Sequence, residues 1–369
     1  MSAVPWTLYT YFGRLFLLSV AAVQGGIMAL VFLVDLIEML RQHADRAGMT
    51  WSLLVGMSLL KMPNLAEKVL PFSVFFAAMW AFFRLTRTSE LVVTRAAGVS
   101  VWQFLAPALL IALGGGWLIV CLFNPISAAM TARYAALEAK YIRGEASLLY
   151  MANSGLWLRQ ADKNATDGSG LIVHALRVND RRLDLDDVII WRLTREGGFL
   201  ERVDAASASL REPNWEIRDA TITPNQGPSE HRDVYRIPTT ITATQIRESF
   251  ASPDTLSFWD LPRFIQMAES AGFSALRHRM HWHALLALPF LLGAMVLIAA
   301  NFSIKFMRHA GRIRLAATGV LTAFLIFFVS NFAAALGQSG VLPVMLAAWF
   351  PTGLAMALGA NMLLHSEDG

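Results

Sequence analysis

The fold class is decided by VWQFLAPALLIALGGGWLIVCLFNP, residues 101–125. Its first 23 residues carry no charged side chain, and a helix needs about 20 apolar residues to cross a bilayer. Asn124 and Pro125 follow this run, and proline cannot continue a helix interior without losing a hydrogen bond. We therefore expect a membrane-spanning helix over Val101–Phe123 that stops at Asn124-Pro125.

Apolar stretches of similar character recur on both sides of this segment. We expect five further spans, at Leu15–Leu36, Val69–Phe83, His281–Ala300, Leu315–Leu336 and Leu342–Leu364. Trp51–Met62 is also apolar and is interpreted as an interfacial helical turn leading into the second span. No small-residue cleavage site follows the first apolar run, which favours an uncleaved helix over a signal peptide.

The composition excludes an ordinary soluble protein. Hydrophobic residues make up 55% of the 369 residues and charged residues 16%, where soluble domains have about 45–50% and about 25%. Residues 144–262 hold 13 basic and 18 acidic side chains, while the remainder of the chain holds 18 basic and 9 acidic ones. An acidic, polar middle segment thus interrupts a basic, apolar chain.

The middle segment has the pattern of an all-β domain. Short β-branched stretches such as GLIVHALRV (residues 170–178) and DDVIIWRLT (residues 186–194) alternate with clusters of Gly, Pro, Asn and Asp. Regularly spaced strands with such turn signals indicate a sandwich or jelly roll. We predict an α-helical membrane protein with six transmembrane helices and an inserted all-β, jelly-roll-like domain, divided into residues 1–143, 144–262 and 263–369.

Basic residues in two short loops predict the orientation. Arg84–Gly98 holds three arginines and one acid, Glu90, and Asn301–Arg314 holds four basic residues and no acid. Because cytoplasmic loops carry an excess of Lys and Arg, both loops should be cytoplasmic. Both chain ends are then cytoplasmic, and the β domain lies on the opposite side of the membrane.

The sequence contains none of the common catalytic signatures. It has no G-x-x-x-x-G-K-[ST] phosphate loop, no G-x-S-x-G, no H-E-x-x-H and no kinase signature. The single cysteine excludes an internal disulfide framework, and His278, His281 and His283 are better explained as interfacial histidines than as metal ligands. We expect no enzyme active site, metal or cofactor in this chain, and no nucleic-acid partner.

The loop RLTRTSELVVTRAAGVS, residues 84–100, has the signals of a short helix. Thr88 or Ser89 can cap it, Glu90 suits its positive N-terminal end, and Gly98 suits its stop. Such a helix across the membrane plane could dock on a partner. The simpler interpretation is a basic loop that only fixes the topology.

Ionisable residues at the end of the first span are candidates for binding, because charges in a membrane are costly. Asp35 and Glu38 end this span and Arg41 follows. They lie near the outer surface, where long side chains reach water at lower cost. Their function is either to anchor the helix at the interface or to contact a substrate.

Two further groups have a structural and a functional interpretation. Lys61, Glu67 and Lys68 can pair among themselves at helix spacing, which would make them structural. The aromatic face of the fifth span either packs against helices and lipid or lines a lipid-binding cavity; it consists of Phe324, Phe327, Phe328 and Phe332.

The order of these segments resembles the LptF/LptG family of lipopolysaccharide export permeases. The resemblance covers essentially the whole chain, with three spans, an outer β domain and three more spans. Its most specific parts are LPFSVFFAAMWAFFRL (residues 70–85), RTSELVVTRAAGVS (residues 87–100), NPISAAMTARY (residues 124–134) and SLLYMANSGLWLRQ (residues 147–160). The last of these looks closer to LptG than to LptF.

The resemblance implies a permease subunit of an ABC transporter rather than an enzyme. Family members pair LptF with LptG, and two copies of the ATPase LptB, which bind ATP and Mg, drive the pair. The pair extracts lipopolysaccharide from the inner membrane, and the periplasmic β domains pass it to LptC and the bridge protein LptA. We therefore expect a multi-pass protein of the bacterial inner membrane with these partners.

The resemblance also assigns roles to residues. The family's coupling helix corresponds to about residues 86–99, and its acidic residue matches Glu90, with Arg87, Leu91 and Arg95 beside it. In the family, basic residues near the outer end of span one contact the lipid phosphates.

This sequence departs from the family pattern at that place. It has Phe32 and Glu38 where the family pattern leads us to expect a lysine, and it keeps Asp35. Phosphate recognition then rests on Arg41 and Arg46, on the partner subunit or on other residues, or the lipid A has altered phosphorylation.

Two other classes of function remain open. A membrane-anchored β-domain protein for binding or signalling needs neither an ATPase nor a paralogous partner. A secondary transporter usually shows inverted repeats and broken helices at the membrane midplane, and neither pattern is visible in this sequence.

Overall fold

The computed structural model describes most of the chain, namely residues 6–43, 50–138, 141–142, 149–152, 155–161, 170–179, 184–194, 198–211, 214–239, 252–270, 274–305 and 312–367. The chain divides into two compact units. The membrane unit takes in residues 1–134, 254–261 and 276–369, and the β unit takes in residues 135–253 and 262–275.

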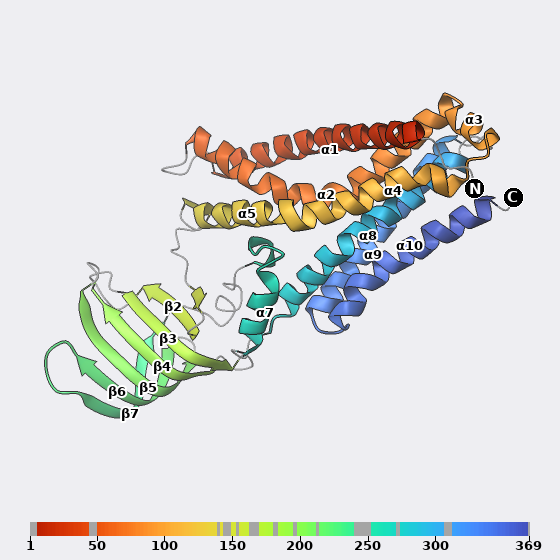
Figure 1. Ribbon diagram of the computed structural model, residues 1–369. Helices are drawn as coiled ribbons and strands as arrows, with labels where there is room; N and C mark the ends of the chain where they lie inside the picture. The colour runs from red at the N-terminus through yellow and green to blue at the C-terminus, as the bar shows by residue number, and fades with distance from the viewer. Residues whose placement is uncertain are drawn as a thin grey trace. The chain divides into compact units, whose positions relative to one another are not determined.

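Within the described residues, six helices are long and apolar enough to cross a membrane (Figure 1). They are α1 (Trp6–His43), α2 (Trp51–Arg87), α4 (Val101–Leu118) continued by η1 (Ile119–Phe123) and α5 (Asn124–Glu138), α8 (Leu276–Lys305), α9 (Arg312–Gln338) and α10 (Val344–Glu367). The six spans predicted from the sequence are therefore confirmed. Trp51–Met62 is not a separate turn, because α2 continues through it without interruption.

The third span does not stop at Asn124-Pro125, contrary to the expectation from sequence. A π-helical turn, η1, precedes Asn124, and its wider hydrogen-bond spacing joins the Asn124 N–H to the carbonyl of Ile119. Pro125 lies in the first turn of α5, and because it has no N–H it cannot donate to the carbonyl of the preceding turn. The helix nevertheless passes the proline instead of ending there.

The fourth span, α8, is the central helix of the membrane unit. In its most apolar stretch 72% of the residues are buried, against 6% in α1. α8 packs against α2, α4 and α10. Two glycines permit close approach: Gly116 of α4 lies against the backbone of Pro289, and Gly359 of α10 lies against Leu297.

The described strands of the β unit form one seven-stranded antiparallel sheet. The strands are β1 (Leu149–Ala152), β2 (Gly155–Ala161), β3 (Gly170–Asn179), β4 (Asp184–Leu193), β5 (Phe199–Arg211), β6 (Asn214–Pro224) and β7 (Glu230–Pro238). The predicted all-β domain is thus confirmed. Each strand pairs with its neighbours in sequence, which makes a meander, whereas a jelly roll contains Greek-key crossovers.

A line of interrupted pairing crosses the middle of this sheet. Asp187 of β4, Ala206 of β5 and Asp219 of β6 lie on it, and the register between neighbouring strands steps over each of them. Asp187 and Asp219 have left-handed backbones, with φ of 54° and 57°. The buried positions change parity across the line, from Ile217 to Ala220 on β6 for example. The sheet bends here, so both halves turn apolar side chains to one interior.

A polar contact across this interior shows how far the sheet bends. The Tyr235 hydroxyl donates to Glu201 Oε1 at 3.4 Å, and Arg192 pairs with the same oxygen at 2.9 Å. In strand register Glu201 lies opposite Pro224, whereas Tyr235 lies opposite Ile217. Seven residues of a flat strand span about 23 Å, so only a folded-over sheet brings these side chains together.

Two short elements follow the sheet in the chain. They are η3 (Pro253–Thr255) and α7 (Leu261–Ser270).

Candidate functional site

A short helix, α3 (Glu90–Ala96), lies in the connection between the second and third spans (Figure 1). Ser89 precedes it with a left-handed backbone, φ 63°, and the Thr88 hydroxyl donates to Glu90 Oε1 at 2.8 Å. Glu90 occupies the first turn, where a carboxylate interacts favourably with the positive end of a helix. Gly98 then turns the chain with φ 85°, a conformation that glycine adopts without strain.

α3 exposes a small apolar surface. Val92 and Val93 are 49% and 68% exposed, whereas Leu91 is buried in the core of the membrane unit. Arg87 and Arg95 are exposed, and Glu90 is half-buried. Of the residues that the sequence associated with coupling, Leu91 therefore anchors the helix. Val92 and Val93 face outward. The sequence shows three apolar residues in a row at this place, and the difference between the buried leucine and the exposed valines is visible only in the structure.

Asp35, a candidate from the first span, joins α1 to α2. Its Oδ1 accepts a hydrogen bond from Lys61 Nζ at 2.6 Å, and its Oδ2 accepts one from the Ser58 hydroxyl at 2.7 Å. The Lys61 ammonium also lies 5.7 Å from the centre of the Tyr134 ring. Asp35 thus neutralises a lysine on the neighbouring span.

Glu38 and Arg41 form an ion pair with each other on the surface of α1, at 3.0 Å. The Gln42 amide also donates to Glu38. Both charged side chains are exposed, and Phe32 on the same helix is half-buried. An exposed pair of this kind contributes little to stability, so these side chains remain available for other contacts. Arg46 lies outside the described residues.

The expectation that Lys61, Glu67 and Lys68 pair among themselves is wrong. Each binds a different segment: Lys61 binds Asp35, and Lys68 binds Asp254 at 2.6 Å. Glu67 Oε2 accepts a hydrogen bond from the amide of Asn124 at 3.1 Å. Each of these residues therefore binds a polar group that another segment of the chain brings next to it, and not a neighbour on its own helix.

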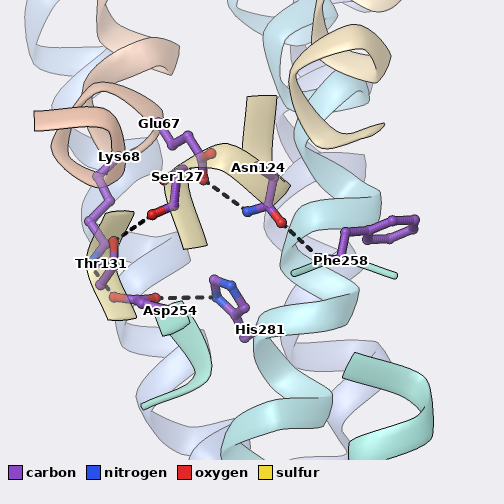
Figure 2. A network of polar contacts seen from close by, with 8 residues as sticks. All are labelled: Glu67, Lys68, Asn124, Ser127, Thr131, Asp254, Phe258 and His281. Atoms are coloured by element: carbon purple, nitrogen blue, oxygen red, sulfur yellow. Dashed lines mark hydrogen bonds and ion pairs between the residues drawn. The ribbon is translucent and has the colours of Figure 1, made fainter. Parts of the chain in front are cut away.

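The π-helical turn η1 and Pro125 form what we call the break in the third span, and Figure 2 shows the polar network around it, which includes the contacts of Glu67 and Lys68. Asn124 is its centre, because its amide donates to Glu67 while its Oδ1 accepts from the backbone N–H of Phe258 at 2.8 Å. Asp254 lies between Lys68 and His281, with its Oδ1 3.6 Å from Nδ1 of the histidine. The network joins α2, η1–α5, α8 and the segment that carries residues 254–258.

The electrostatic environment of Asp254 favours its charged form. Burial would raise the pKa of this carboxyl, but the hydrogen bond and positive charge of Lys68 outweigh it and lower the pKa below its ordinary value. His281 contributes in the same direction. Asp254 is therefore an ionised partner of Lys68 over the physiological pH range.

All four aromatic candidates on α9 are exposed. Phe324 is 53% exposed and packs against Phe72 of α2, with ring centres 5.1 Å apart. Phe328 is 67% exposed and stacks on Phe332 of its own helix at 6.3 Å. The Phe324 end of this aromatic face thus packs on α2, and the end formed by Phe328 and Phe332 is exposed apolar surface.

The family model of the lipopolysaccharide export permeases LptF/LptG matches residues 10–365. The match includes all six spans and the β unit. The chain belongs to the LptF/LptG family. It is also similar to the lipopolysaccharide export system permease protein LptG of Haemophilus influenzae, with 24% identity over 98% of this chain and 99% of that protein.

Membership fixes the general character of this LptF/LptG permease. It is a multi-pass protein of the inner membrane and most resembles LptG. Its family is one of transport permeases.

Sequence reasoning missed the role of residues 254–261 in this permease. The segment lies between the β-rich part of the sequence and the fourth span, and its composition resembles an ordinary loop. The aromatic pair Phe258-Trp259 beside Asp254 and Asp260 was the only local signal that could have indicated a docked segment.

Proposed function

We propose that this chain is the permease subunit of an ABC transporter that extracts lipopolysaccharide from the inner membrane and passes it to a periplasmic bridge. The observation that carries the proposal is the family match over residues 10–365. α3 supports it, because a short helix with exposed apolar residues between two spans can transmit the movement of a docked protein.

In this proposal ATP hydrolysis belongs to a separate LptB-like ATPase dimer, which binds ATP and Mg²⁺. The sequence itself has no phosphate loop. Val92 and Val93 form the apolar part of the docking surface, and Glu90, Arg87 and Arg95 form its polar edge. Leu91 holds the helix against the membrane core, so that displacement of α3 displaces the spans.

A second, LptF-like permease subunit is the proposed partner inside the membrane. Only 6% of the apolar stretch of α1 and 22% of that of α9 are buried within this chain. A solitary bundle would leave these two helices largely surrounded by lipid. A paralogue of the same fold can cover them and enclose a cavity between the two sets of six spans.

Such a cavity lowers the cost of lipid extraction. Each methylene group contributes about 0.8 kcal/mol when it is removed from water, so the several acyl chains of lipopolysaccharide need a continuous apolar path. We assign the exposed rings of Phe324 and Phe328, together with Phe32, to this path. The headgroup contacts are assigned to Asp35, Glu38 and Arg41 at the end of the first span.

The proposed orientation follows the basic loops of the sequence. Both termini and α3 face the cytoplasm, and the β unit faces the periplasm, where it meets LptC-like and LptA-like proteins. The apolar interior of the bent sheet supports this hand-off, since it offers acyl chains a surface that excludes water.

Purification of this chain from its own membranes in a mild detergent tests the proposal. We expect mass spectrometry to find a second six-span permease, an ATPase subunit and lipopolysaccharide with it. The alternative is a membrane-anchored binding or signalling protein. Recovery of the chain alone, from membranes in which the ATPase is demonstrably present, would favour that alternative.

A further inference from the structure

Residues 254–261 return to the membrane unit between two stretches of the β unit. The chain belongs to the β unit up to residue 253 and again over residues 262–275. The eight residues between pack with the membrane spans. We call them the clamp. The chain enters the clamp from the β unit and returns to the β unit after it, so the clamp is covalently connected to that unit at both ends.

The clamp is held mainly at the break in the third span. The Phe258 N–H donates to Asn124 Oδ1 at 2.8 Å, and the Trp259 indole N–H donates to the backbone carbonyl of Cys121 at 3.0 Å. Phe258 and Leu261 share a small apolar core with Val120 of the π-helical turn. Asp254 adds the contacts with Lys68 and His281 that Figure 2 shows.

The Trp259 indole replaces a hydrogen-bond donor that the third span lacks. In an α-helix the carbonyl of Cys121 would accept from the N–H of residue 125. That residue is Pro125, which has no N–H. Trp259 supplies a donor to this carbonyl from 138 positions away, so the local structure of the break depends on the presence of the clamp.

We propose that the clamp is a conformational coupling device: it holds the break in the third span while docked, and its release during each transport cycle links movement of the β unit to movement of that span. This inference rests on the proposed function as a lipid transporter. The clamp contacts the break through the Phe258 backbone N–H and the Trp259 indole N–H, and its ion pair with Lys68 joins it to the second span.

Two features make release feasible without unfolding the core. The Trp259 side chain is 62% exposed, and the Lys68 side chain is 55% exposed in its pair with Asp254, so water can replace both contacts. Nε2 of His281 and Nε1 of Trp282 are buried without a hydrogen-bond partner among the described residues. Both lie on α8, which the clamp contacts, and both would gain hydration when it leaves.

A reversible cross-link between the clamp and the span tests the release. Cys121, the single cysteine, is first changed to serine, which leaves its backbone carbonyl in place. Asn124→Cys and Phe258→Cys then place two thiols at positions that a hydrogen bond of 2.8 Å joins, from the Phe258 N–H to Asn124 Oδ1. Oxidation or a short bis-thiol reagent closes the link, and mass spectrometry verifies it.

We expect closure to reduce lipopolysaccharide transport by the whole complex in proteoliposomes at least tenfold, and a reductant to restore it. Each single-cysteine variant should be insensitive to oxidation. Undiminished transport by the cross-linked complex would overturn the proposal. The Cys121→Ser complex reports on the proposed function itself, since its failure to transport this lipid would contradict that function and not the clamp.

A second measurement judges the clamp independently of transport. Trp259→Phe removes the indole N–H, and we expect faster hydrogen exchange at backbone amides of residues 119–126 in the purified full chain. Trp80→Phe, which changes an equally exposed tryptophan on α2, is the matched control. Exchange that is equal in the two variants would mean that the clamp does not hold the break.

Discussion

Gly116 of α4 meets Pro289 of α8 so closely that no other side chain fits between them. A Cβ atom at Gly116 would lie 2.6 Å from the Cα of Pro289 and 2.9 Å from its Cβ. The obstructing atoms belong to the backbone and to a rigid ring, so they cannot rotate away. A single hydrogen atom in place of a side chain therefore sets the distance between the third and fourth spans.

Gly116→Ala should destabilise the permease by about 1–3 kcal/mol or more, as overpacking of a core does. Gly115→Ala is the matched control, because a Cβ there meets nothing within 4 Å and alanine is favoured over glycine in a helix by about 1 kcal/mol. Thermal unfolding in detergent measures both. Equal midpoints for the two variants would show that the helices do not pack as closely as described.

Asp254 should make the stability of the membrane unit depend on acid pH. Its pKa is lowered in the fold by Lys68, so at acid pH the unfolded chain binds more protons at this site. The stabilisation is complete above the unfolded pKa of about 4 and is lost as pH falls through the lower folded pKa.

Thermal midpoints measured in detergent from about pH 6 to about pH 3 check this prediction. Asp254→Asn should be less stable than the parent near neutral pH and should lose less stability on acidification. Asp260→Asn changes an exposed carboxylate of the same segment and should retain the pH dependence of the parent. Parallel curves for the parent and Asp254→Asn would contradict the assignment.

At the scale of elements, α3 combines anchorage with exposure. Leu91 and Thr94 are buried, the latter with its hydroxyl donating to the Glu90 carbonyl at 2.7 Å, while the two valines between them face outward. Seven residues are too few for a helix to be stable alone. α3 therefore forms because its inner face packs on the spans, and that packing also makes it a rigid connection to them.

Glu90→Lys and Glu90→Ala should weaken ATPase docking while the protein still folds. Loss of one partner from a charge pair at an interface costs about 2–5 kcal/mol, so we expect co-purified ATPase to fall about tenfold or more. The charge reversal should have the larger effect. Unchanged co-purification and unchanged lipid export in both variants would exclude Glu90 from the coupling role.

The β sheet depends on a contact between its own two halves. Burial first, and then the nearby Glu201 carboxylate, raise the pKa of the Tyr235 hydroxyl, which keeps it protonated as a donor. Arg192 balances the charge of Glu201 at 2.9 Å. These contacts join the two halves of the sheet across the line where the register steps over Asp187 and Asp219.

Tyr235→Phe should destabilise the β unit by about 0.5–1.5 kcal/mol, the usual net value of one hydrogen bond. Hydrogen exchange of strand amides in β5 and β7 measures the change. Val234→Ala, at an exposed neighbouring position of β7, should have little effect. If the two variants exchange alike, the hydroxyl does not tie the halves together.

At the scale of the whole molecule, the same chain builds a helical membrane unit and a β unit, and the peptide passes between them more than once. The membrane unit is assembled from three separate stretches of sequence. Such interleaving means that neither unit can be defined by cutting the chain at a single place. The side of the membrane on which the β unit lies therefore depends on the number and direction of the spans that precede it.

Thiol labelling tests that topology. In the Cys121→Ser background, Gln226→Cys lies in the exposed turn between β6 and β7 and Val93→Cys on the exposed face of α3. A membrane-impermeant maleimide should label the first in intact spheroplasts and the second only after the membrane is permeabilised. Labelling with the opposite pattern would reverse the proposed orientation.

Local patterns of residues were enough to predict the class of the molecule. A long apolar run crosses a bilayer as a helix, because its backbone N–H and C=O groups can then bind each other. The six spans therefore followed from local composition. Alternation of β-branched residues with turn signals likewise determined the β character of the middle segment. Both are properties of neighbouring residues, which are adjacent in the printed sequence.

Only the tertiary structure decided where those elements bend, pass a proline or find their polar partners. At the π-helical turn the carbonyl of Cys121 cannot accept from Pro125, which has no N–H, and it accepts from Trp259, 138 positions after the cysteine. Lys68 pairs with Asp254, 186 positions away, and not with its helix neighbour Glu67. Desolvation decides such choices, because a buried polar group must bind whatever partner the fold brings near it, and sequence spacing does not encode that proximity.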